Sequence, residues 1–305
     1  MPPPYSNVAY QFGRNLYSIF QKINGPPSHG PHEVQKFENL IKSFGFLGAS
    51  GFQVGNYHGK YSQVEFYPTS PWTRLDPRCE LADVLFVAYD TKQMRISFLQ
   101  AKSKVHTKPF PIWVANTEQF IVLSHRPTIT RWLGAAVWNN DVLSKAILPS
   151  IGSFGTFTGV PGGSVDFTYS SADCLVPRGA PKAGGKYISG LFDLSYPPAI
   201  GRKDVSSFYE RTYCPNMIDF GTAIFSLEIG SPISCLGSPL DSNVSALNAR
   251  IALSRWASQE SIRSPNDLIL KGLLDSPHLI DLPSEQTNGH NLLGAKHVVV
   301  IKANA

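Results

Sequence analysis

The chain lacks the long apolar run that a membrane span requires, since no stretch of about 18 consecutive apolar residues occurs in it. It also lacks the pattern of a secretory signal, because the residues from Met1 to Tyr5 are not basic and then apolar. We therefore expect a soluble, cytoplasmic protein with no membrane partner.

Cysteine is scarce and poorly spaced for metal binding or disulfide formation. The 4 cysteines include no C-x-x-C pair, and no two histidines stand at the spacing of zinc ligands. No G-x-S-x-G motif marks a serine hydrolase, and the Gly-Gly-Lys at 184–186 lacks the full pattern of a nucleotide-binding P-loop. These absences argue against a structural zinc site, a disulfide framework, a serine hydrolase triad and a P-loop nucleotidase.

The composition is that of a globular protein with a mild basic excess. Of the 305 residues, 42% are hydrophobic, which is ample for one large domain or two ordinary ones. The formal net charge of +5, from 27 basic and 22 acidic residues, is compatible with an anionic partner such as nucleic acid. The charge alone does not require such a partner.

Two amphipathic helices are expected near the N-terminus. The first covers residues 6–23, with Ser6 or Asn7 as its N-cap. The second begins at Pro31, a favoured first-turn position for proline, and Gly45 is expected to end it. Residues 47–78 are rich in Gly, Tyr, Pro and Ser, so we expect loops there, with a short hairpin around residues 63–67.

Two apolar, β-rich runs follow, from Asp83 to Tyr89 and from Arg95 to Ala101. The polar residues between them predict a β-hairpin, and their nearly continuous apolar character predicts a place in a sheet covered on both faces. A helix from about Thr117 to Ser124 comes next. The order helix, helix, strand, strand, helix favours an α/β core with a central sheet and flanking helices.

The second half of the chain is less regular. Residues 150–240 are rich in Gly, Ser and Pro, with short β-like runs such as Thr222 to Ile229. Helices are expected from about Asn243 to Ser258 and from Ser264 to Leu274, and a strand from His297 to Lys302. We expect residues 1–145 to form the core, and residues 146–305 to form an α+β region that completes or extends it. Alternatively, residues 146–305 are the functional part of the chain and recognise a target or a partner.

Three polar side chains stand where the hairpin brings two strand ends together. Asp83 opens an apolar strand, where a charge is costly unless it is paired or binds a metal. Gln100 and Lys102 are two residues apart on the next strand, so they share one face while Ala101 lies on the other. Phosphodiester hydrolysis needs oxygen ligands for a divalent cation and benefits from a lysine near the developing negative charge. The pattern indicates that chemistry.

The segments Glu80-Leu81-Ala82-Asp83 and Gln100-Ala101-Lys102 resemble the PD-(D/E)XK nuclease superfamily, in the branch where Gln replaces the first acid of the (D/E)-x-K pair. The resemblance implies a restriction-endonuclease-like core with a mixed sheet between helices. It also implies Mg²⁺-dependent cleavage of DNA, with Mn²⁺ as the alternative metal, in restriction, antiviral defence or repair. By this resemblance, Asp83 binds the metal, Gln100 supplies an oxygen or positions a water, and Lys102 is the catalytic lysine. The Pro-Asp dipeptide of the family is absent here.

Many members of the superfamily add a glutamate from the helix before the hairpin. Glu33 and Glu38 are the candidates. At about 100° per residue Glu33 falls within the apolar arc of its helix and Glu38 at the edge, so Glu33 is preferred as a further catalytic and metal-binding residue. Glu80 is either a secondary metal contact or part of the approach loop, and Gln119 weakly matches a glutamine that some related nucleases carry.

Basic residues near the motif are candidates for contacts with DNA phosphates. They are Lys104, Lys108 and Arg126, together with Lys182 and Lys186 from a Gly-rich basic segment. A solvated surface run is the alternative for all of them. The alternative function is a catalytically weak or inactive nuclease-fold subunit that binds nucleic acid or a partner protein, such as a helicase or a subunit of a defence system.

Overall fold

The computed structural model describes residues 6–25, 33–53, 63–67, 77–103, 113–132, 141–159, 164–182, 190–195, 202–205, 208–236, 240–259 and 295–303. Within these residues the structure is mixed α/β, and none of its helices is both long and apolar enough to cross a bilayer. The expected helix between residues 264 and 274 lies outside the described residues. The α-helices are α1 (Asn7–Asn24), α2 (Glu33–Phe46), α3 (Thr117–His125), α4 (Met217–Phe225) and α5 (Val244–Gln259).

The first two helices form largely as the sequence predicts. Ser6 is the N-cap of α1, where its hydroxyl accepts a hydrogen bond of 3.2 Å from the backbone N–H of Ala9. The predicted end of α2 was wrong, because the helix runs through Gly45 and ends at Phe46. The chain leaves the helix at Gly48, whose φ of 83° lies in the left-handed region that favours glycine.

The central sheet has 8 strands among the described residues and is mixed in direction. β16 (Ala295–Lys302) is parallel to β4 (Ala82–Tyr89), and β8 (Gly152–Gly159) is parallel to β5 (Gln93–Ser103), whereas the other neighbours are antiparallel. Strands from both sides of residue 145 therefore share one sheet. In spatial order the strands are β1 (Ser50–Gln53), β16 (Ala295–Lys302), β4 (Ala82–Tyr89), β5 (Gln93–Ser103), β8 (Gly152–Gly159), β9 (Val165–Ser171) and β14 (Tyr213–Cys214), and β15 (Ser231–Cys235) pairs with the start of β5.

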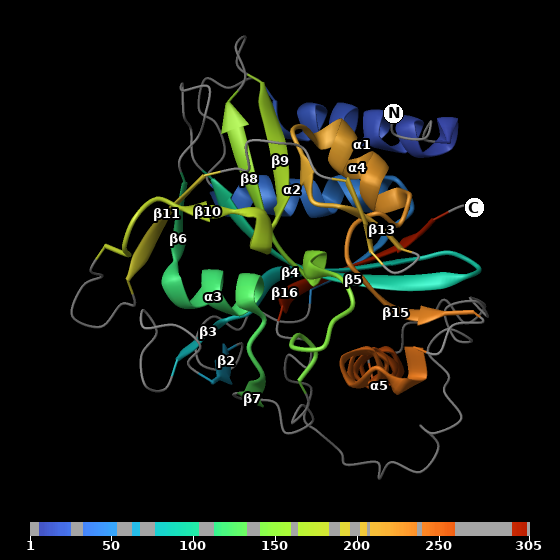
Figure 1. Ribbon diagram of the computed structural model, residues 1–305. Helices are drawn as coiled ribbons and strands as arrows, with labels where there is room; N and C mark the ends of the chain where they lie inside the picture. The colour runs from blue at the N-terminus through green and yellow to red at the C-terminus, as the bar shows by residue number, and fades with distance from the viewer. Residues whose placement is uncertain are drawn as a thin grey trace.

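Helices cover the sheet on both faces (Figure 1). Val84 and Phe86 of β4 belong to the core cluster that includes residues of α1, α2 and α4. Leu85 and Val87 belong to the opposite cluster, which includes residues of α3 and α5. The alternation along β4 shows that both faces of this strand are buried, so the prediction from its continuous apolar run is confirmed.

The predicted strand from Thr222 to Ile229 was wrong, because its first part belongs to α4. Asn216 caps this helix by accepting a hydrogen bond of 2.8 Å from the backbone N–H of Asp219. Phe220 and Ile224 are buried, as is most of the helix. A helix that is apolar on nearly all sides loses the 3.6-residue period, so a short apolar run does not distinguish it from a buried strand.

Smaller sheets and single turns complete the described fold. The hairpin expected around residues 63–67 is instead a single strand, which pairs with the strand at residues 78–80 and with the more distant strand at residues 129–132. These elements are the sheet of β3 (Arg78–Glu80), β2 (Gln63–Phe66) and β7 (Ile129–Trp132), the sheet of β10 (Val176–Pro177), β11 (Leu191–Ser195) and β6 (Trp113–Asn116), the pair β12 (Arg202–Val205) and β13 (Phe208–Arg211), and 3-10 turns at Pro149–Ile151, Ala172–Cys174 and Leu240–Ser242.

Candidate functional site

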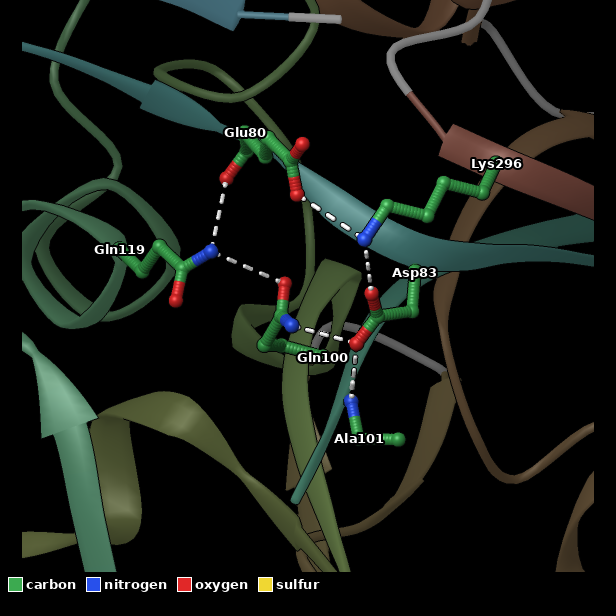
Figure 2. A network of polar contacts seen from close by, with 6 residues as sticks. All are labelled: Glu80, Asp83, Gln100, Ala101, Gln119 and Lys296. Atoms are coloured by element: carbon green, nitrogen blue, oxygen red, sulfur yellow. Dashed lines mark hydrogen bonds and ion pairs between the residues drawn. The ribbon is translucent and has the colours of Figure 1, made fainter. Parts of the chain in front are cut away.

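Asp83 and Gln100 are in direct contact at the open end of the β4–β5 hairpin. Antiparallel pairing places Val84 opposite Leu99. Asp83 precedes Val84 and Gln100 follows Leu99, so these two residues come next to each other at the end of the paired segment. The Gln100 Nε2 donates to Asp83 Oδ2, and the same oxygen accepts a hydrogen bond of 2.9 Å from the backbone N–H of Ala101 (Figure 2). Gln100 is only 3% exposed, so the amide that orients the carboxylate is fixed in the core.

Gln119 of α3 extends this chain of contacts. Its Nε2 donates to Gln100 Oε1 at 3.2 Å and to the backbone oxygen of Glu80 at 3.4 Å. The helix is positioned by Asn116, whose side chain caps the backbone N–H groups of Glu118 and Gln119. Gln119 therefore links α3, β5 and the segment before β4 through one side-chain amide.

Lys296 joins the same cluster from β16, far along the sequence. The parallel register of β16 pairs Ala295 with Ala82 and His297 with Val84, which brings Lys296 level with Asp83. Its Nζ lies 3.0 Å from Asp83 Oδ1 and 3.0 Å from Glu80 Oε2 (Figure 2). Burial lowers the pKa of Lys296, but the two carboxylates outweigh it, and the net pKa is raised above the usual lysine value.

Sequence reasoning missed Lys296 as a residue of this cluster. It lies outside the predicted strand, which began at His297, and only the extension of β16 to Ala295 includes it. Parallel pairing between strands so distant along the chain leaves no local signal, because the register is set by the whole sheet. Glu80 and Gln119 were noted from the motif, and the structure brings both into contact with the cluster.

Lys102 continues the face of Gln100 along β5. Ile96 and Phe98 of that face pack in the cluster with α3, whereas Leu99 and Ala101 pack in the opposite cluster. The side chain of Lys102 is half-buried. With the other residues that the structure describes, its side chain forms no hydrogen bond or ion pair, whereas Lys296 contacts two carboxylates. Its ammonium is thus not committed to a carboxylate of the cluster.

The structure describes the side chain of only one of the two candidate glutamates of α2. Glu33 is the first residue of α2, and its side chain lies outside what the structure describes. Glu38 is half-buried and, with Asp83, opposes the lowering of the His297 pKa that burial causes. The His297 ring also packs edge-on against Phe37, with centroids 5.6 Å apart. Of the two glutamates, Glu38 is thus the one with a described electrostatic link to this end of β16.

The predicted phosphate contacts are only partly described. Lys104, Lys108 and Lys186 lie outside the described residues. Arg126 takes the left-handed C-cap position of α3 and donates to the backbone oxygen of Ala146 at 3.2 Å. Lys182 forms an ion pair with Asp193 while its side chain stays 69% exposed. Arg126 thus has a structural contact, and Lys182 is accessible to solvent.

The two carboxylates around Lys296 are of the kind that bind small cations. Among the described residues, no three His, Cys, Asp or Glu side chains gather as a metal cluster. Two carboxylates nevertheless converge on one positively charged atom, since Asp83 and Glu80 both contact Lys296 Nζ. Mg²⁺ is commonly held by one or two carboxylates and keeps several waters. Asp83 and Glu80 therefore fit such an ion, with the ammonium now in the position between them.

Comparison with known proteins identifies no relative for this chain. A scan against protein-family models found no match, and searches of curated proteins and of solved structures found none either. Any functional assignment therefore depends on the residues at the open end of the β4–β5 hairpin.

Proposed function

We propose that this protein is a metal-dependent endonuclease with a restriction-endonuclease-like core of the PD-(D/E)XK type, in which Asp83, Gln100 and Lys102 form the active site. The observation that carries the proposal is the contact between Asp83 and Gln100 across adjacent strands. The mixed sheet with helices on both faces, and β8 parallel to β5, agrees with the fold that the resemblance implies.

In this proposal Asp83 and Glu80 hold Mg²⁺ or Mn²⁺ through carboxylate oxygens, with Glu33 or Glu38 as a further candidate. When bound, the divalent cation polarises the scissile phosphate and lowers the pKa of an attacking water. Gln100 fixes the Asp83 carboxylate by donating to Oδ2, while its own oxygen accepts from Gln119. In this proposal Gln100 positions Asp83, and its side-chain oxygen remains a candidate metal ligand, because an amide oxygen has two lone pairs and Gln119 donates to it once.

In this proposal Lys102, two residues beyond Gln100 on β5, supplies positive charge to the active site. It lies on the same face of β5 as Gln100 and forms no ion pair with another residue that the structure describes. An uncommitted ammonium can donate to a phosphate oxygen or to the attacking water as negative charge develops. The proposed substrate is DNA, by the resemblance alone, and restriction, antiviral defence or repair are the proposed settings.

The experiment that tests the function is a cleavage assay with the purified protein. Supercoiled plasmid, linear duplex and single-stranded DNA are each incubated with Mg²⁺, with Mn²⁺ and with EDTA. We expect cleavage of at least one DNA substrate with metal and none with EDTA. Cleavage that persists unchanged in EDTA, or no cleavage of any substrate with either metal, contradicts the proposal.

Two observations favour the alternative of a nuclease fold that binds nucleic acid without cutting it. Lys296 neutralises part of the charge of Asp83 and Glu80, and Gln stands where many related nucleases have an acid. Under this alternative the protein binds DNA or a partner, such as a helicase, with equal affinity in Mg²⁺ and in EDTA. A DNA-binding titration run beside the cleavage assay separates the two functions.

A further inference from the structure

The ammonium of Lys296 occupies the position between the two carboxylates that the proposed function assigns to a metal. Its Nζ is 3.0 Å from Asp83 Oδ1 and 3.0 Å from Glu80 Oε2. The side chains are only partly exposed, at 23% for Lys296, 13% for Asp83 and 21% for Glu80. Partial burial strengthens such charge interactions relative to those at a fully exposed surface.

The other contacts of Asp83 are of a different kind. Asp83 Oδ2 is held by the buried amide of Gln100 and by a backbone N–H, so that oxygen is fixed by rigid groups. Asp83 Oδ1, in contrast, is held by the end of a lysine side chain. A lysine ammonium is a compact charge on a flexible four-carbon stem, so it is the one partner that can leave without moving a strand.

We infer that Lys296 is an internal counter-ion that competes with a divalent cation for Asp83 and Glu80. The cation binds only when the ammonium leaves, so the lysine sets the metal concentration at which the site fills. This inference rests on the proposed function for the identity of the ligand. It assigns a regulatory role to a residue outside the Asp83–Gln100–Lys102 motif.

Removal of the lysine charge should therefore tighten metal binding. In Lys296→Met, two partly buried carboxylates lose their shared cation, and a divalent ion becomes their best available partner. Lys296→Gln serves as a second variant, because its amide can still donate a hydrogen bond while carrying no charge. Lys296→Arg keeps the charge and should not tighten binding. Lys302→Met, at the exposed end of the same strand, is the matched control.

The probe is Mn²⁺ alone, with affinity measured by calorimetric titration and by the metal-dependent rise in Tm of the full chain. We expect both neutral variants to bind Mn²⁺ at least about tenfold more tightly than the wild type, the scale on which contacts to metal ligands change affinity. The gain should vanish when Asp83→Asn is added to Lys296→Gln. Equal Mn²⁺ affinity in wild type, Lys296→Gln and Lys296→Met overturns the inference.

The inference and the proposed function fail in different measurements. If the wild type cleaves DNA with Mg²⁺ but the neutral variants bind Mn²⁺ no more tightly, the competition is disproved and the nuclease proposal stands. If the neutral variants gain Mn²⁺ affinity while neither they nor the wild type cleave DNA, the competition stands and the nuclease proposal fails.

Discussion

Gln119 donates a hydrogen bond of 3.2 Å to the side-chain oxygen of Gln100, which leaves the nitrogen of Gln100 directed at Asp83. The orientation of one amide thus sets the orientation of the next, and the second amide holds the carboxylate. Both amides are almost fully buried, so water does not readily replace either contact. A helix residue distant from Asp83 in sequence is in this way coupled to the candidate active site.

Gln119→Met should uncouple Gln100 while preserving the volume of the side chain. Because the amide of Gln100 then loses its fixed orientation, we expect the turnover number for DNA cleavage to fall about 10- to 100-fold. KM should change little, since Gln119 has no expected contact with DNA. Gln11→Met, which removes an exposed amide on α1, is the control. A turnover number equal to that of the wild type contradicts the coupling.

Lys102→Ala should abolish most cleavage while the protein stays folded. The loss of a cationic donor near the developing charge is expected to lower the rate by about 100-fold or more. Lys92→Ala removes an exposed lysine from the turn at the other end of the hairpin and should leave the rate unchanged. Circular dichroism checks the fold of both variants, and full activity of a folded Lys102→Ala excludes the assigned role.

Two glycine substitutions should have opposite effects on stability. A Cβ at Gly13 would lie 2.2 Å from the backbone oxygen of Ile218, because α1 and α4 are in close contact there. Gly13→Ala is expected to lower the free energy of unfolding by about 1–3 kcal/mol. At Gly45, exposed in α2, no described atom outside the backbone of its own helix and its two chain neighbours lies within 4 Å of the position that a Cβ would take, so Gly45→Ala should raise the free energy of unfolding by up to about 1 kcal/mol. Urea denaturation measures both, and a neutral Gly13→Ala contradicts the close packing.

Asp166 should make the stability depend on pH. Burial raises its pKa above the usual aspartate value, although its Oδ1 accepts hydrogen bonds from the backbone N–H groups of Phe167 and Met217. A carboxyl with a raised folded-state pKa contributes stability below its unfolded pKa, and loses that contribution as pH rises through the folded value. Asp166→Asn should therefore be more stable than the wild type at pH 7, and the difference should shrink toward pH 3. A constant difference across this range, measured by urea denaturation, contradicts the assignment.

The sequence predicted the elements with a local signal and missed those without one. The hairpin was predictable because Asp83 to Tyr89 and Arg95 to Ala101 are apolar runs around a polar turn, and Asp90 caps that turn through Lys92 and Gln93. The face shared by Gln100 and Lys102 followed from the two-residue period of a strand. The buried helix α4 was mistaken for a strand, because nearly all of its sides are apolar.

The residues of the candidate site also differ in whether a local sequence signal predicts them. Asp83 and Gln100 were predictable because they lie near each other in sequence and on paired strands. Lys296 was not predictable, because it reaches the site through the parallel pairing of β16 with β4, two strands that are far apart in the sequence. That pairing is determined by which strands fill the centre of the sheet, and no residue near Lys296 encodes it alone.

The measurement that tests the central claim most directly is Mg²⁺-dependent DNA cleavage by the wild type and by Asp83→Asn. Asp90→Asn is assayed beside them, because it removes a carboxylate from the opposite end of the same hairpin while an asparagine can still cap the turn. We expect Asp90→Asn to cleave like the wild type, and folded Asp83→Asn to show no cleavage with either Mg²⁺ or Mn²⁺. Cleavage by Asp83→Asn at the wild-type rate would show that this carboxylate is not part of an active site.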